Sequence, residues 1–214
     1  MWSTFVDGLS SVLVQLATWL DGSYGAAVIA LAVLVRLAML PMTLKNAEQG
    51  WWRQQQLLAL KPKLARLKER HAGDPAAQAQ AMQALYREHG LTGGLGSGLL
   101  VALVQAPLGA GIYAAIRQGV AGAGSFLWIP KLARPDMWLA LVVGLLSFAA
   151  LLLNPAMSEQ TRTLLQWLPV VISLLVVWHL AAGLGLYWAG SSAVNLVQMA
   201  MLRRRVRSRF VGAV

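Results

Sequence analysis

The chain has 214 residues, of which 57% are hydrophobic and 12% are charged, and its formal net charge is +10. A charged fraction about half that of an average soluble domain indicates a membrane protein, and the length fits one domain. Because there is no cysteine, the composition excludes disulfides, thiolate metal sites and a lipidated cysteine anchor.

The chain opens with a hydrophobic segment, Trp2–Leu20, that is short for a membrane span and carries Ser, Thr, Gln and Asp7. Tryptophans near both ends, Trp2 and Trp19, are typical of a helix that lies in the membrane interface. The segment lacks the positive start and the small-residue cleavage pattern of a signal peptide. We therefore expect residues 1–23 to form an extracytoplasmic interfacial helix.

The next segment, Tyr24–Leu44, is long enough to cross a bilayer as a helix and contains a single charge, Arg36. Its guanidinium either extends toward the Lys45 end of the span or faces a polar cavity inside a helix bundle. Arg36 and Lys45 are nine residues apart, roughly 13 Å at the helical rise. This is a long reach for one side chain, so we favour the cavity and predict a functional site at Arg36.

Residues 45–90 predict two amphipathic helices. Pro62 should bend the first helix, and Gly73 should end it. Asp74 and Pro75 supply an N-cap and a first-turn proline for the second, which completes a helical hairpin. Two interpretations stay open: a rigid connector packed on itself, and a mobile basic paddle that touches lipid headgroups or an incoming chain. Basic residues occupy most faces of the first helix. Its leucines recur at helical spacing on the remaining face: Leu57, Leu60, Leu64 and Leu67.

Four further spans are expected after the hairpin. The second and third are Leu99–Ile116 and Met137–Leu153. Leu164–Leu202 contains no Asp, Glu, Lys or Arg and is too long for one span. Gly183 and Gly185 should form the turn that divides it into a fourth and a fifth span.

The basic residues set the orientation. With five spans, residues 45–90, 154–163 and 203–214 lie on one side of the membrane. They hold eight, one and five basic residues, fourteen of the eighteen in the chain. The predicted fold is therefore an all-α membrane protein with five transmembrane helices and a cytoplasmic helical hairpin between the first and second spans. Its N-terminus is outside, and its C-terminus is in the cytoplasm.

Five segments together resemble the YidC/Oxa/Alb family of membrane protein insertases. They are VRLAMLPMTLKNAE (Val35–Glu48), ALKPKLARLKER (Ala59–Arg70), DPAAQAQAMQALYREHG (Asp74–Gly90), LVQAPLGAGIY (Leu103–Tyr113) and GLYWAGSSAVNLVQ (Gly185–Gln198). Members help hydrophobic segments enter the bilayer without ATP, through a hydrophilic groove that is closed toward the outside. The resemblance implies that residues 24–202 form this membrane core and that Arg36 lies in the groove.

The resemblance also implies a multi-pass protein of a bacterial plasma (inner) membrane, with no enzyme activity and no cofactor. No metal site is expected, because there is no cysteine and the three histidines, His71, His89 and His179, are far apart in the sequence. The expected partners are newly made membrane proteins and the lipid bilayer. Contacts with a Sec translocon, and of the basic tail with a ribosome, stay open, and for the tail anionic lipid is the favoured alternative. No DNA partner is expected.

Other polar side chains are candidates for the groove. Trp188, Ser191, Asn195 and Gln198 fall on one face of the fifth span, and Gln105 is the strongly polar residue of the second span. Interhelical hydrogen bonding is the alternative for such residues, and it is favoured for Ser191 and Asn195 taken individually.

The chain departs from the family pattern before the second span, where LTGGLGSGLL (Leu91–Leu100) replaces the usual proline motifs. This predicts a short, divergent member with an open substrate range. A small anion channel or transporter is the alternative function, because an intramembrane arginine suits anion passage. The spans show no inverted repeat and no second intramembrane charge, however, which disfavours a transporter.

Overall fold

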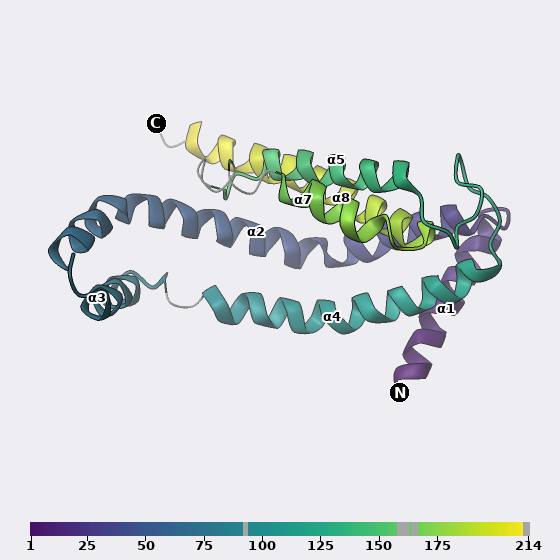
Figure 1. Cartoon of the computed structure of the whole chain (residues 1–214), viewed down its shortest axis with the longest axis horizontal. Coiled ribbons are helices and arrows are strands. Elements are labelled where there is room, and N and C mark those ends of the chain that lie inside the picture. The colour runs from purple at the N-terminus through teal and green to yellow at the C-terminus, as the bar shows by residue number, and fades with distance from the viewer. Residues whose placement is uncertain (92–93, 158–162, 164–166, 212–214) are drawn as a thin grey trace.

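The computed structural model describes residues 1–91, 94–157, 163 and 167–211. Within these residues the regular secondary structure is helical apart from one isolated bridge between Phe126 and Ile129 (Figure 1), which confirms the all-α class. In chain order the elements are α1 (Trp2–Trp19), α2 (Tyr24–Arg70), α3 (Pro75–Glu88), α4 (Gly94–Gly119), the short turn η2 (Val120–Gly122), α5 (Met137–Leu153), α7 (Leu168–Ile172), the π-helical segment η3 (Ser173–Val177) and α8 (Ala182–Val211).

One helix within the described residues, α2, is long and apolar enough to cross a membrane. The apolar helix α5 has the predicted bounds of the third span but only 17 residues. Part of the predicted fourth span, residues 164–166, lies outside the described residues. The number of five spans therefore stays a prediction.

Helix α2 joins the predicted first span to the first hairpin helix without a break, and Pro41 and Pro62 both lie inside it. Figure 1 shows the helix curving where it approaches α3. The predicted boundary at Lys45 marks a change of surroundings, from apolar to charged neighbours, and the backbone stays helical through it. The basic tail behaves in the same way, because α8 continues past Arg203 as far as Val211.

Helix α3 begins where the sequence predicted. The Asp74 carboxylate accepts hydrogen bonds from the backbone N–H groups of Ala76 and Ala77, both at 3.0 Å. The helix packs against the end of α2 but buries none of its own residues fully. In the second half of α2, Arg53 donates a 2.6 Å hydrogen bond to the Leu91 carbonyl. This bond connects the chain after α3 to α2.

The main core cluster lies toward the N-terminal ends of α2 and α8. It combines residues of α1, α2, α4 and α8 with the segment between η2 and α5, which buries Ile129 and Leu132. The same segment caps α8, because the Leu132 and Arg134 carbonyls accept hydrogen bonds from the N–H groups of Gly183 and Ala182 at 3.0 and 2.8 Å. Two donors that a helix start leaves unpaired are thereby satisfied.

The turn predicted at Gly183 and Gly185 is wrong by a few residues. Residues 178–181 make the turn, and both glycines lie in the first turn of α8. They occur there because neighbouring helices approach closely: a Cβ on Gly183 would lie 2.5 Å from Val120 Cγ1, and one on Gly185 would lie 2.7 Å from Leu139 Cδ2.

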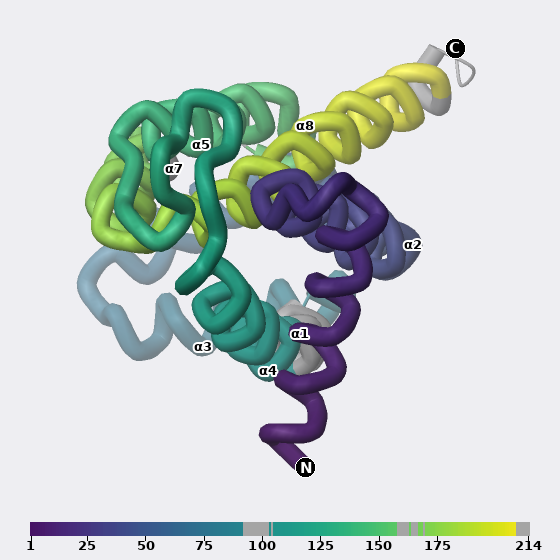
Figure 2. The backbone as a smooth tube through the Cα atoms, turned by 90° about the vertical axis from the view of Figure 1, so that its right-hand side faces the viewer, coloured from purple at the N-terminus to yellow at the C-terminus, as the bar shows by residue number. Residues whose placement is uncertain are grey.

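A second cluster lies farther along α2 and α8. Leu44, Ala150, Met199 and Leu202 are buried together there, so α2, α5 and α8 form one packed layer. Figure 2 shows α8 alongside both α5 and α2, with α4 on the other side of the molecule. Helix α4 packs chiefly against α1, where Phe5 lies against Gly111.

The close approach at Gly183 gives a stability prediction. Gly183→Leu should destabilise the fold by ~1–3 kcal/mol, because the added side chain overpacks the contact with Val120. Gly50→Leu is the matched control, since Gly50 is also helical and has nothing within 4 Å of a Cβ. Thermal unfolding of both variants in detergent should show a loss for Gly183→Leu alone. Equal melting temperatures would contradict the close packing.

Candidate functional site

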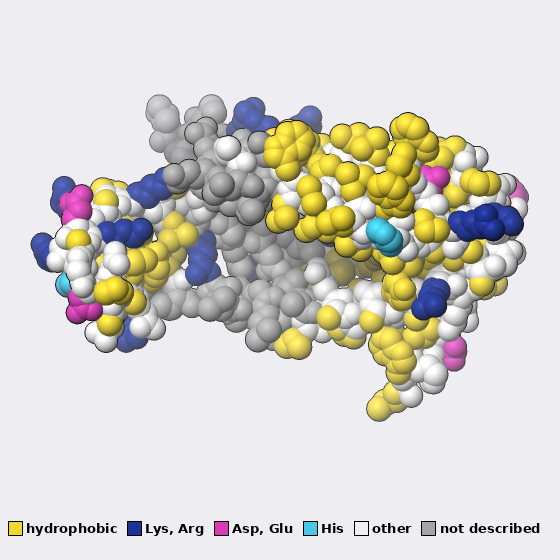
Figure 3. Space-filling model, in the orientation of Figure 1, with side chains coloured by type: hydrophobic (Ala, Val, Ile, Leu, Met, Phe, Trp, Pro, Cys, Tyr) yellow, Lys and Arg dark blue, Asp and Glu magenta, His cyan; other side chains and the backbone are white. Residues whose placement is uncertain are grey.

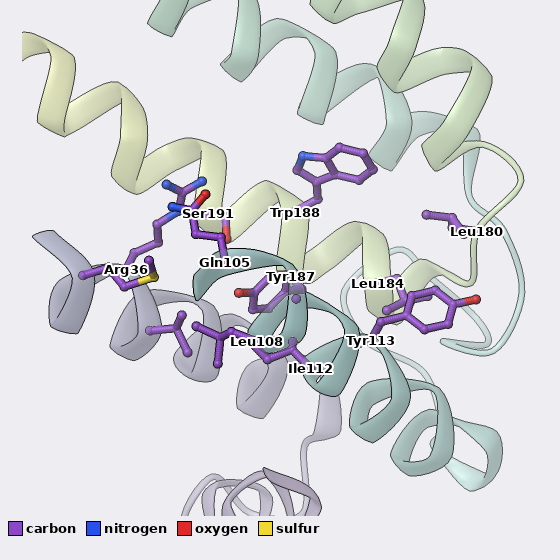
Figure 4. Close-up of a pocket in the computed structure, with 13 residues that line it drawn as sticks. Arg36, Gln105, Leu108, Ile112, Tyr113, Leu180, Leu184, Tyr187, Trp188 and Ser191 are labelled. Atoms are coloured by element: carbon purple, nitrogen blue, oxygen red, sulfur yellow. The ribbon is translucent and has the colours of Figure 1, made fainter. Parts of the chain in front are cut away.

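A cavity of about 400 Å³ opens between α2, α4 and α8 (Figure 4). Each helix contributes a polar side chain and several apolar ones, and Leu180, two residues before α8, completes the lining. The lining residues are Val35, Arg36, Met39, Gln105, Leu108, Gly109, Ile112, Tyr113, Leu180, Leu184, Tyr187, Trp188 and Ser191.

One end of the cavity is polar. Arg36 comes from α2, Gln105 from α4 and Ser191 from α8, and Figure 4 shows the three side chains converging. Ser191 is 4% exposed, whereas Arg36 is half-buried. Because the ion pair in the described part of the chain joins Arg205 to Glu48, the Arg36 guanidinium has no carboxylate partner there.

The other end of the cavity is apolar. Ile112 and Leu184 are buried and belong to the main core cluster, and Leu180 packs against that cluster. The same cluster contains Ile129 and Leu132 of the segment that caps α8. The cavity therefore ends at packed apolar side chains near the start of α8.

Four of the six residues predicted for a groove line this one cavity: Arg36, Gln105, Trp188 and Ser191. The Trp188 indole turns away from Arg36 in Figure 4 and packs against the buried residues Ala140, Val143 and Val177 of α5 and η3. Only part of Trp188 therefore faces the cavity.

Asn195 and Gln198 are not among the lining residues, so the predicted stripe does not stay with the cavity along its whole length. Gln198 is 3% exposed and accepts a 3.2 Å hydrogen bond from the Thr43 hydroxyl of α2. At Gln198 the stripe has reached a level where α8 contacts α2 directly. For Gln198 the contact is the interhelical hydrogen bond that was the alternative interpretation.

Sequence reasoning missed the two tyrosines of the lining, Tyr113 and Tyr187. Tyr187 could have been found, because it lies four residues before Ser191 and so shares its face of the helix. Tyr113 comes from α4 and is partly exposed. Figure 4 shows the Tyr187 ring between the polar and the apolar ends of the cavity.

The residues present favour binding over bond-breaking chemistry. An unpaired guanidinium in apolar surroundings holds water and can bind a carboxylate through two hydrogen bonds. A serine nucleophile at Ser191 would need a histidine base beside it. His179 does not line the cavity, and its Nδ1 is hydrogen-bonded to the Leu175 carbonyl of its own turn at 2.7 Å, so it is not placed to act as that base. The described residues contain no group of three or more His, Cys, Asp or Glu that could hold a metal ion.

The chain is similar in sequence and in fold to known proteins. The sequence model of the family described as 60Kd inner membrane protein matches residues 15–209. The membrane protein insertase YidC of Staphylococcus carnosus (strain TM300) is 26% identical over 211 residues, which cover 92% of this chain and 73% of the relative. YidC of Staphylococcus aureus (strain JH9) is 28% identical over 212 residues with the same coverage.

Among solved structures, an active YidC insertase crystal structure with its first transmembrane domain resolved is similar, with a TM-score of 0.62 and 26% identity. The match covers 92% of this chain and 46% of the other. This chain therefore corresponds to about half of the length of that protein.

The hydrogen bond between Thr43 and Gln198 predicts a coupling between two helices. Thr43→Val and Gln198→Met should each destabilise the fold, and the double variant should lose less than the sum, with a coupling energy of ~0.5–2 kcal/mol. Gln105→Met is the control, because Gln105 is exposed in the cavity and should show no coupling to Thr43→Val. Unfolding in mixed micelles is measured for the three single variants and for both double variants that contain Thr43→Val. Additive losses for Thr43 and Gln198 would contradict the bond.

Proposed function

The chain belongs to the 60Kd inner membrane protein (YidC/Oxa/Alb) family of membrane protein insertases, and on this basis we propose that the cavity around Arg36 receives the polar part of a membrane protein during its insertion. The observation that carries the proposal is a guanidinium without a carboxylate partner among the described residues, in a cavity walled by the apolar side chains of three helices. No ATP is needed in this proposal.

The physical problem is that a short polar or acidic tail must cross hydrocarbon. Burying its charged and polar groups costs several kcal/mol or more when they have no partners. A hydrated arginine part-way along the path shortens the unhydrated distance and offers a carboxylate a charge-assisted hydrogen bond. Gln105 and Ser191 add neutral partners for a backbone carbonyl or amide.

The driving force comes from the substrate itself. A Leu, Ile, Phe or Val at the centre of a span contributes ~0.3–0.6 kcal/mol to insertion, so a segment of ~20 apolar residues gains several kcal/mol on entering lipid. Apolar lining residues such as Leu108 and Met39 border the polar end, so the apolar segment can leave the cavity sideways. In this proposal the protein lowers the free-energy barrier that the polar tail meets on crossing the membrane.

The proposed orientation places α3 and the end of α8 in the cytoplasm and the segment between α4 and α5 outside, because fourteen of eighteen basic residues then face the cytoplasm. The apolar end of the cavity is then the outer one, closed by the packed core, and the polar end is nearer the cytoplasm. In this arrangement α1 lies in the outer interface, and α3 with the end of α2 forms the mobile basic paddle. The lack of fully buried residues in α3 supports this role.

An anion channel is the second candidate function, and the cavity disfavours it. Anion passage requires a continuous path with repeated polar or charged contacts. Here one charged residue lines the cavity, and its far end is closed by Ile112, Leu180 and Leu184.

The first test concerns Arg36. Arg36→Ala should leave the fold intact, because it removes an intramembrane charge, and should slow insertion of a small single-span substrate with an acidic tail about tenfold, as expected for the loss of a charge-assisted hydrogen bond. Arg36→Lys should keep much of the activity if charge and hydration matter most. Protease protection of the substrate in reconstituted liposomes is the measurement.

Two controls accompany this experiment. Arg117→Ala removes an exposed arginine of α4 that does not line the cavity and should insert substrate normally. A substrate with a strongly apolar segment and almost no polar tail should be least affected by Arg36→Ala. Equal loss for both substrates, or unfolding of Arg36→Ala, would mean that Arg36 supports the structure instead.

The second test concerns orientation. Because the chain has no native cysteine, single cysteines report position cleanly. Ala79 on α3 and Gly124 after η2 are both exposed. An impermeant thiol reagent added outside intact cells should label Gly124→Cys and spare Ala79→Cys until the membrane is opened. The opposite labelling pattern would reverse the proposed topology.

A further inference from the structure

A second crevice, separate from the cavity at Arg36, lies between α2 and α8. Its volume is about 400 Å³, within the range of small-ligand sites. Figures 1 and 2 show the two helices running side by side here. Its lining residues are Leu40, Pro41, Leu44, Lys45, Glu48, Met201 and Arg205.

The crevice lies where both helices change from apolar to charged. The apolar run of α2 ends at Leu44 and is followed by Lys45, and that of α8 ends at Leu202 and is followed by arginines. Leu44 and Leu202 are buried in the same cluster, so the two runs end at the same level. In the proposed orientation this level is the cytoplasmic headgroup region of the bilayer.

The lining has an apolar part and a positively charged part. Leu40, Pro41 and Met201 supply an apolar floor with open surface, while Lys45 and Arg205 supply two cations on its charged side. Pro41 and Lys45 are four residues apart on α2, and Met201 and Arg205 are four apart on α8. On both helices, therefore, a cation stands one turn beyond an apolar floor residue on the same face.

Among the described residues, Glu48 is the one carboxylate that lines the crevice. Because two cations, Lys45 and Arg205, line it as well, the net charge of the lining is positive. Its Oε1 lies 3.5 Å from a guanidinium nitrogen of Arg205, and the two side chains are 25% and 51% exposed. A pair this open to solvent is weak, and a guanidinium has five N–H donors, so Arg205 keeps donors for a second anion. Lys45 has no carboxylate within ion-pair distance among the described residues.

We propose that this crevice binds an anionic phospholipid, with the phosphate between Lys45 and Arg205 and an acyl chain along Leu40, Pro41 and Met201. Basic pockets between membrane helices on the cytoplasmic side have the chemistry for such headgroups. A bound lipid would bridge α2 and α8 at the level of the Glu48–Arg205 pair and stabilise their packing. The proposal rests on the membrane placement of α2 and α8 in the proposed function, and it does not require insertase activity.

The test uses the purified full-length chain in an uncharged detergent, titrated with phosphatidylglycerol or with phosphatidylcholine of the same acyl chains. Bound lipid is counted by native mass spectrometry, and the melting temperature is measured with and without lipid. Phosphatidylglycerol should bind more tightly and raise the melting temperature more. Lys45→Gln and Arg205→Gln should each weaken its binding about fivefold, as expected for one charge near a headgroup, and leave phosphatidylcholine binding unchanged.

Two further variants separate lipid binding from general charge and from structure. Lys61→Gln removes one charge from α2 outside the crevice and should not change lipid binding. Glu48→Gln should strengthen phosphatidylglycerol binding, because it removes the carboxylate and frees Arg205. If Glu48 and Arg205 acted only as a structural pair, Glu48→Gln would lower the melting temperature without improving lipid binding, and the proposal would be wrong.

Other outcomes would also overturn the proposal. Equal binding of the two lipids, or equal losses for Lys61→Gln and Lys45→Gln, would exclude a specific headgroup site. Competition by free glycerol phosphate or by a short RNA at the same phosphate concentration would show a plain anion site, in which the apolar floor does not act. Lipid binding and the melting temperature are measured without any insertion substrate. Failure of the lipid site is therefore distinguishable from failure of the proposed insertase function.

Discussion

The unpaired positive charge of Arg36 is the constraint on which the rest of the structure depends. A guanidinium in a membrane-spanning helix is costly unless it finds water or polar partners, and the described residues offer it no carboxylate. The solution is a cavity to which three helices contribute, with Gln105 and Ser191 beside the charge and packed side chains at the far end. On the face drawn in Figure 3, apolar side chains cover much of the described surface.

The helices around the cavity are held unequally. Helices α2 and α8 pack against each other in one register, with Gly190 near Ala32, Gln198 on Thr43 and Arg205 on Glu48. Helix α4 instead packs chiefly on α1 and meets α8 at few places. The firm pair supplies Arg36 and Ser191 in fixed relation, while the more weakly attached α4 supplies the wall beside Gln105. In the proposed function this asymmetry lets a substrate enter and leave without disturbing the pair that carries the charge.

The sequence by itself determined the features that depend on local chemistry. Asp74 and Pro75 marked the start of α3, because capping involves only neighbouring backbone groups. Composition and apolar periodicity gave the helical class and the bounds of α5, Met137–Leu153. Arg36 was identified from its apolar neighbours alone, because the penalty of a charge in hydrocarbon does not depend on which helices surround it.

Only the tertiary structure decided which polar residues share the cavity and what the glycines do. Gln198 and Ser191 lie on one helix face, yet the position of α2 leaves one beside Thr43 and the other in the cavity. Gly183 carries the same sequence signal whether it makes a turn or admits a close neighbour, and here Val120 occupies the space of its missing side chain. These outcomes depend on contacts between residues far apart in the chain, and helical periodicity records only the direction of a side chain from its own axis.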